Sequence, residues 1–177
     1  RHNRPSIVLE RRAAASEAGA GIQVGPNGTR LLRRLGVADA LAPCVGRPDA
    51  TARRDGASAA VLARLPLGPW ARERWGDPYW VMHRADLHGA LLARAMQESL
   101  VDDAGDAATV TSTAGEALSA PLLVGADGLW STIRRLAFAA PALVFAGQTA
   151  ARAVIPAAAA AALPRDEVGV WLGRDAH

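Results

Sequence analysis

The chain has 177 residues, of which 50% are hydrophobic and 21% are charged, so it can build a packed core and is not expected to be disordered as a whole. No run approaches the roughly 18 consecutive apolar residues of a membrane span. Nor is there an apolar stretch behind the first five residues that is long enough for a secretory signal. We therefore expect a cytoplasmic protein without a membrane partner, and the single cysteine, Cys44, excludes an internal disulfide.

The basic charge of the chain is carried entirely by arginine. All 20 residues counted as lysine or arginine are arginine, while the net charge is only +3. The neighbouring arginine pairs at 33–34, 53–54 and 134–135 are spread along the chain instead of clustering. This distribution argues against a nucleic-acid partner.

The first predicted elements are a strand, a small-residue segment and a helix. The run SIVLE at residues 6–10 is apolar and ends in an acid, which is typical of a buried parallel strand. Residues 18–24 are mostly small, so their backbone can lie close to a flat group. A helix follows, with Asn27 as its expected N-cap and Gly36 as its expected end. Its leucines recur at helical spacing, and three side chains are expected to face water: Arg30, Arg33 and Arg34.

The middle of the chain is predicted to hold short strands and one helix. Residues 42–78 are rich in proline, glycine, alanine and arginine, and we interpret them as an excursion of short strands and loops, with a weak strand signal at 59–65. Residues 79–82 are a strand candidate. They run into a helix with Asp86 as its cap and an apolar face made of Leu87, Leu91 and Ala95.

The last third of the chain continues the alternation of strands and helices. Residues 109–118 predict a β-hairpin, and the apolar run at 122–124 predicts a buried strand that leads into a helix through Ile133. Six alanines at 157–162 indicate a short helix or linker without chemistry. Strands that alternate with helices predict an α/β fold with a largely parallel sheet.

Three places beside predicted strands could bind a ligand. Glu10 ends a strand, at the edge where open α/β sheets bind ligands, and its carboxylate could accept both hydroxyls of a nucleotide ribose; the alternative is a solvated acid. Asp127 and Gly128 also follow a strand, where they could turn toward a ligand; the alternative is an ordinary turn with the aspartate as a helix cap. Arg84, at a strand-to-helix junction, could bind a phosphate or ribose oxygen, or it could be a surface arginine.

Other reactive chemistries have little support in the sequence. His83 and His88 lack a third ligand, so no metal site is predicted. Ser131 has no histidine and acid in a hydrolase order and no G-x-S-x-G turn around it. We therefore name no catalytic residue.

The order of these motifs carries a family resemblance. The motifs are VLE at residues 8–10, GAGIQ at 19–23, HRADLH at 83–88 and LVGADG at 123–128, the last followed by a serine and an arginine. In this order they resemble the flavin-dependent aromatic hydroxylases, the single-component FAD monooxygenases that include salicylate and 6-hydroxynicotinate hydroxylases. Two further segments resemble strands of that family's substrate-binding sheet: residues 147–152 and 170–173.

The resemblance implies a fold and a domain division. The fold would be an FAD/NAD(P)-binding, Rossmann-like three-layer α/β fold with part of a β-rich substrate domain. The FAD-binding domain would cover residues 1–138, with the excursion at about 45–78 inside it. The substrate-binding sheet would begin in residues 139–177.

The resemblance also implies roles for the candidate residues. Glu10 would bind the adenosine ribose of FAD, and Arg84 would contact the FAD ribose or phosphate region. Gly21 and Ile22 would lie near the isoalloxazine ring. The Asp-Gly pair, Asp127 and Gly128, would serve the cofactor region, where FAD binding is linked to the use of NAD(P)H.

The implied reaction is hydroxylation of a small aromatic or phenolic substrate with NAD(P)H and O2, through a C4a-hydroperoxide of the flavin. The expected partners are that substrate and O2, and the assembly considered is a homodimer. Two alternatives stay open. One is a related flavoprotein epoxidase, halogenase or polyketide-tailoring oxygenase, and the other is a flavin-free remnant that acts as an interaction module.

The chain departs from the family in several places. It has neither the family's opening G-x-G-x-x-G loop nor its second FAD motif, and a short acidic stretch at 97–106 stands where a sheet strand is expected. Ala151 stands where the substrate strand would carry tryptophan. We interpret the sequence as part of a longer enzyme.

Overall fold

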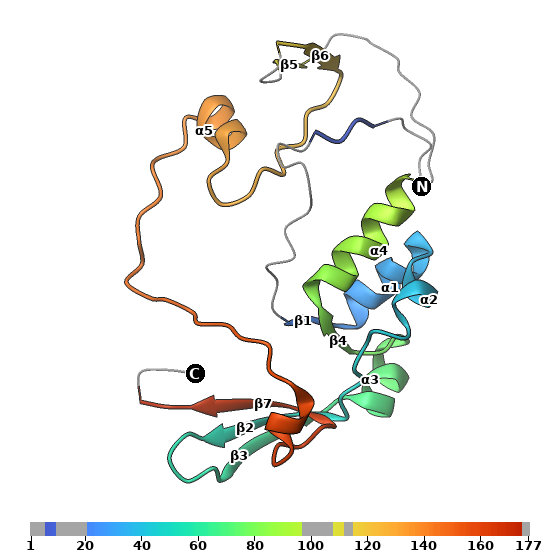
Figure 1. Ribbon diagram of the computed structural model, residues 1–177, viewed down its shortest axis with the longest axis vertical. Coiled ribbons are helices and arrows are strands. Elements are labelled where there is room, and N and C mark those ends of the chain that lie inside the picture. Colours follow the sequence, from blue (N-terminus) through green and yellow to red (C-terminus); the bar gives the residue numbers. More distant parts are fainter. Residues whose placement is uncertain (1–5, 10–20, 97–107, 112–114, 175–177) are drawn as a thin grey trace. The chain divides into compact units, whose positions relative to one another are not determined.

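The computed structural model describes residues 6–9, 21–96, 108–111 and 115–174 (Figure 1). The chain divides by its contacts into a smaller unit, Arg1–Glu10 with Ser99–Ala151, and a larger unit, Arg11–Glu98 with Arg152–His177. The secondary structure is mixed α/β, as the sequence predicts. No helix within the described ranges is long and apolar enough to cross a membrane.

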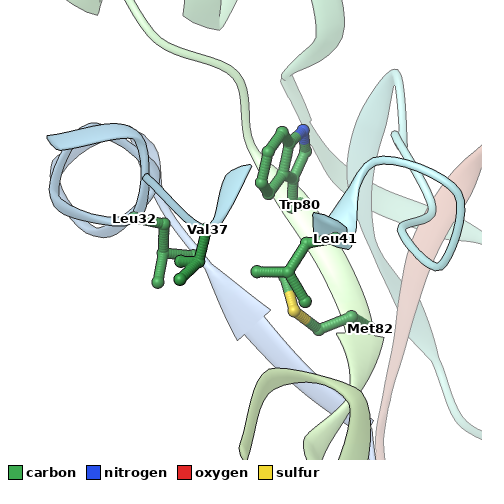
Figure 2. Packing of buried hydrophobic residues seen from close by; sticks show 5 residues of the cluster. All are labelled: Leu32, Val37, Leu41, Trp80 and Met82. Carbon is green, nitrogen blue, oxygen red and sulfur yellow. The ribbon is translucent and has the colours of Figure 1, made fainter. Parts of the chain in front are cut away.

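A strand pair and three helices build the core of the larger unit. Strand β1 (Gly21–Val24) pairs antiparallel with β4 (Trp80–His83). Helices α1 (Pro26–Leu35), α2 (Ala38–Leu41) and α4 (Arg84–Met96) pack around this pair. Buried side chains from these elements, together with Val37 between α1 and α2, meet in one cluster (Figure 2): Leu32, Val37, Leu41, Trp80 and Met82.

Helix α1 ends as its sequence predicts but begins differently. Gly36 has φ +75°, in the left-handed region that favours glycine, and it donates its N–H to the carbonyl of Arg33, which ends the helix. The N-cap is Gly25, not Asn27. Pro26 takes the first helical position, where its missing N–H is no loss, so Asn27 already lies inside the first turn.

Helix α4 follows β4 without a connecting loop. It begins at Arg84, so Asp86 lies in its first turn instead of capping it, a position that suits the positive end of the helix dipole. Leu87 and Leu91 are partly buried against the core cluster, which confirms the predicted apolar face, whereas Ala95 is exposed.

A second sheet in the larger unit joins distant parts of the chain. Its strands are β2 (Ala50–Asp55), β3 (Val61–Pro66) and β7 (Glu167–Leu172), in the order β3-β2-β7 (Figure 1). Strand β2 pairs antiparallel with β3 and parallel with β7. The short strands expected in the excursion are therefore confirmed, but its helix α3 (Gly68–Trp75) was not predicted.

The predicted strands near the end of the chain have mixed outcomes. The strand expected at 170–173 is confirmed within β7, whereas residues 147–152 form no strand. The alanine run forms a 3-10 helix over Ala157–Ala160, as the short-helix interpretation predicts. Among the strands of the described ranges, β2–β7 is the single parallel pair, which differs from the largely parallel sheet expected.

The smaller unit confirms its local elements but not its predicted strands. Strands β5 (Ala108–Thr111) and β6 (Ala117–Ala120) form the expected hairpin, and α5 (Thr132–Phe138) is the expected helix. Residues 6–9 and 122–124, expected to be buried strands, are exposed and irregular. An apolar run becomes a strand only when a neighbour accepts its hydrogen bonds, and within the described ranges neither run has one.

Candidate functional site

The pairing of β1 with β4 brings three of the predicted site residues together. Gly21 lies opposite His83 in the ladder, and Ile22 lies opposite Met82. Arg84 follows His83 directly and begins helix α4. These three predicted residues, Gly21, Ile22 and Arg84, therefore share one end of the strand pair, although 60 or so positions separate them along the chain.

The two faces of the β1–β4 pair have different characters. Ile22 and Val24 pack with Trp80 and Met82 against the core cluster. Because side chains alternate along a strand, Gly21 and Gln23 lie on the opposite face of β1. Gly21 is exposed, and among the described residues a Cβ built on it would meet only the carbonyl oxygen of Met82 at 3.9 Å. A flat group can therefore approach the backbone at this position.

The outer edge of β1 also presents main-chain hydrogen-bonding groups. In β4, the N–H of Val81 donates a hydrogen bond to the carbonyl of Gly46 at 2.9 Å, and the carbonyl of Val81 accepts the N–H of Gly46 at 2.7 Å. The alternation of an antiparallel ladder then directs the main chain of Met82 toward Ile22. It follows that the N–H and carbonyl groups of Gly21 and Gln23 point away from β4, where they can bind a ligand.

Arg84 supplies positive charge at the same end of the strand pair. Its side chain is exposed, and among the described residues its guanidinium has no hydrogen-bond or ion-pair partner. The side chain of His83, the residue before Arg84, is held by a hydrogen bond: its Nδ1 accepts the backbone N–H of Ala85 at 3.3 Å. A guanidinium without a partner among the described residues is a donor group that suits phosphate and carbonyl oxygens.

A buried carboxylate holds the segment that leads into β4. Asp77 is 3% exposed and binds Arg30 Nε at 3.0 Å and Arg33 Nη2 at 2.9 Å. These two arginines of α1, which we expected to face water alone, are instead ion-paired. Thr29 Oγ1 donates to the carbonyl of Pro78 at 2.7 Å. Helix α1 therefore fixes the start of β4, and with it the place where Arg84 begins α4.

The Asp-Gly motif lies in the smaller unit, where its carboxylate binds the first N–H groups of α5, a helix whose N-cap residue is Ser131. Asp127 accepts hydrogen bonds from the Ser131 hydroxyl, from Thr132 N at 2.7 Å and from Ile133 N at 3.2 Å. Gly128 has φ +79°, so the turn requires glycine. These contacts fit the turn of the alternative interpretation, although the N-cap residue is Ser131 and not Asp127. A cofactor role for the pair stays a prediction. Glu10 lies outside the described residues.

The hydrogen bonds to Asp127 lower its pKa below the ordinary 3.8, with the Ser131 hydroxyl as the largest cause and the backbone N–H groups of Ile133 and Thr132 adding to it. The stabilisation of α5 by this carboxylate is therefore present above that ordinary value and is lost as the pH falls through the depressed one. We expect Ser131→Ala to raise the pKa of Asp127, measured by NMR titration of its carboxyl carbon.

Ser119→Ala provides the matched control for this titration. Ser119 Oγ is hydrogen-bonded to Thr109 Oγ1 at 2.8 Å in the β5–β6 hairpin and does not contact Asp127. The control should leave the Asp127 titration in place. An unchanged titration in Ser131→Ala would show that the hydroxyl does not hold the carboxylate in its ionised form.

Sequence reasoning missed three residues around the β1–β4 pair. Gln23 stands two positions after Gly21 in the same strand, so alternation alone could have placed it on the same face. Asp77 and Tyr79 carry no comparable local signal. Their partners, Arg30 and Gln23, are 47 and 56 positions away in the sequence.

Comparisons with known proteins agree on one group of enzymes, although no family model matches the chain. The 3-amino-4-hydroxybenzoate 2-monooxygenase of Streptomyces cremeus is 38% identical over 96% of this chain and 45% of its own length. The 6-hydroxynicotinate 3-monooxygenase of Pseudomonas fluorescens is 35% identical over 96% of this chain and 47% of its own.

The solved structures point the same way. Klebsiella pneumoniae HpxO, complexed with FAD and uric acid, is 30% identical, with a TM-score of 0.55 over 66% of this chain and 32% of HpxO. The chain spans about half the length of the curated relatives it matches. In both sequence identity and fold, the chain is similar to FAD-dependent monooxygenases of small aromatic compounds.

Proposed function

We propose that the protein is an FAD-dependent monooxygenase that hydroxylates a small aromatic substrate with NAD(P)H and O2. The observation that carries the proposal is the β1–β4 pairing, which brings the open backbone of Gly21 to the same end of the strand pair as Arg84, a residue without a partner among those the structure describes. It is supported by relatives whose names give hydroxybenzoate and hydroxynicotinate monooxygenases. HpxO, crystallised with FAD, supports the cofactor.

The residues present fit FAD by their chemistry. FAD carries two phosphates and a flat ring with carbonyl oxygens, and it therefore needs cationic and N–H donors. Arg84 would bind phosphate or ribose oxygens, and the edge at Gly21 and Ile22 would lie along the ring. When bound, FAD supplies the redox and oxygen-activating chemistry. The chain binds and orients the cofactor and keeps water from the reacting ring.

The remaining predicted residues belong to the same proposal. Glu10 would bind the adenosine ribose, and Asp127 with Gly128 would serve the cofactor region. We further propose that the FAD domain has a Rossmann-like three-layer architecture over residues 1–138. Strand β7, in the segment proposed to begin the substrate-binding sheet, pairs with β2 of the excursion.

An FAD titration of the purified protein tests the proposal. Flavin fluorescence gives the Kd, and denaturing mass spectrometry detects FAD released from the protein. We expect Arg84→Met to raise the Kd for FAD about 10- to 100-fold, because a charge-assisted hydrogen bond contributes about 1.5–3 kcal/mol. Arg34→Met is the matched control: Arg34 is exposed on α1, has no partner among the described residues, and should leave the Kd unchanged.

Gly21→Ala separates binding from folding in the same titration. In the described part of the chain the added methyl group meets nothing closer than 3.9 Å, so the urea midpoint of the protein without FAD should not fall. The methyl group would occupy the space of the ligand, and FAD affinity should therefore fall. Wild-type protein that binds no FAD, or that consumes NAD(P)H without ever hydroxylating an aromatic compound, would overturn the proposed function.

A further inference from the structure

Tyr79 and Gln23 form a side-chain pair beside the exposed glycine of β1. The hydroxyl of Tyr79 donates a hydrogen bond to Oε1 of Gln23. Gln23 is exposed and lies two residues from Gly21, so both are on the face of β1 that points away from the core cluster. The pair therefore stands next to the open backbone described above.

The two residues before Tyr79 are fixed by contacts with helix α1. Tyr79 follows Asp77 and Pro78, and these two residues are bound by Arg30, Arg33 and Thr29 of helix α1. Tyr79 is half-buried, and burial raises the pKa of its hydroxyl. The hydroxyl therefore stays protonated near neutral pH and remains a hydrogen-bond donor.

The tyrosine determines which way the glutamine amide points. A carboxamide has one acceptor oxygen and one NH2 group with two donors, and fixing the oxygen fixes the nitrogen. Oε1 of Gln23 is occupied by Tyr79, while Nε2 has no partner among the described residues. Two oriented N–H donors are thus left beside the main-chain groups of Gly21.

We propose that Tyr79 is a positioning residue, which orients the Gln23 carboxamide so that Nε2 donates a hydrogen bond to an acceptor atom of the flavin ring. This inference rests on the proposed function and adds to it the residue pair that hydrogen-bonds to the flavin ring. A free glutamine side chain would lose rotamer freedom on binding. A glutamine already held by Tyr79 loses less, which strengthens binding by about tenfold.

A double-mutant cycle on FAD affinity tests the role. We expect Tyr79→Phe to raise the Kd for FAD about tenfold, and Gln23→Ala to raise it at least as much, since the donors themselves are removed. If Tyr79 acts through Gln23, Tyr79→Phe should have no further effect in the Gln23→Ala background. Tyr79→Phe should also shift the side-chain 15N–H2 resonances of Gln23 in the protein without FAD.

The outcomes distinguish this role from the proposed function. Wild-type protein that binds FAD, with a Tyr79→Phe variant of equal affinity, would overturn the positioning role alone. Additive effects of the two substitutions would also overturn it, because they would mean that the tyrosine acts independently of the amide. Wild-type protein that binds no FAD would overturn the proposed function and this role together.

Discussion

Asp77→Asn is expected to lower the free energy of unfolding by about 3 kcal/mol, because the substitution keeps the shape of the side chain and removes the charge that two arginines bind. The carboxylate is buried, with Nε of Arg30 at 3.0 Å and Nη2 of Arg33 at 2.9 Å. Both arginine side chains reach solvent, at 42% and 64% exposure, which keeps the cost below that of a fully buried pair. Urea denaturation followed by circular dichroism measures the loss.

Asp39→Asn is the control for this substitution. Asp39 is exposed in the first turn of α2, and no ion pair of its side chain occurs in the described part of the chain. Its replacement should change the free energy of unfolding by no more than about 0.5 kcal/mol. Equal losses in the two variants would contradict the view that α1 and the start of β4 are held together through Asp77.

Leu41→Ala is expected to destabilise the protein by about 3 kcal/mol, through the lost burial of the side chain and the cavity left behind. Leu41 is 1% exposed and lies at the centre of the core cluster, between Val37, Trp80 and Met82 (Figure 2). It is the last residue of a four-residue helix that packs against both α1 and α4. Removing it therefore loosens the packing of several elements around the β1–β4 pair.

Leu31→Ala provides the comparison in the same helical layer. Leu31 lies on α1 but is 56% exposed, so its truncation removes little buried area and should cost less than about 1 kcal/mol. Thermal unfolding of both variants measures the difference in their stability. A Leu41→Ala variant as stable as Leu31→Ala would show that the cluster is not the core of this unit.

Local chemistry determined the elements that the sequence predicts correctly. Gly36 ends α1 because glycine alone reaches the left-handed backbone there without strain, and the information lies within one helical turn. The hairpin of β5 and β6 is likewise local, since its strands are joined by a few residues. The resemblance to flavin-dependent aromatic hydroxylases also came from the sequence, and the monooxygenases that are 38% and 35% identical agree with it.

Tertiary structure decided everything that depends on a distant partner. Arg30 and Arg33 have the spacing of a solvated helix face, yet they bind Asp77 more than 40 positions away. Residues 122–124 have the composition of a buried strand, but composition does not provide the neighbour that a strand requires.

The candidate site shows the same division. The sequence singled out Arg84 at a strand-to-helix junction, with a surface arginine as the alternative, and the family resemblance added Gly21 and Ile22. Only the antiparallel register of β1 and β4 sets them side by side and adds the Tyr79–Gln23 pair. Such a register depends on contacts between segments far apart in the chain, and periodicity within either segment does not encode it.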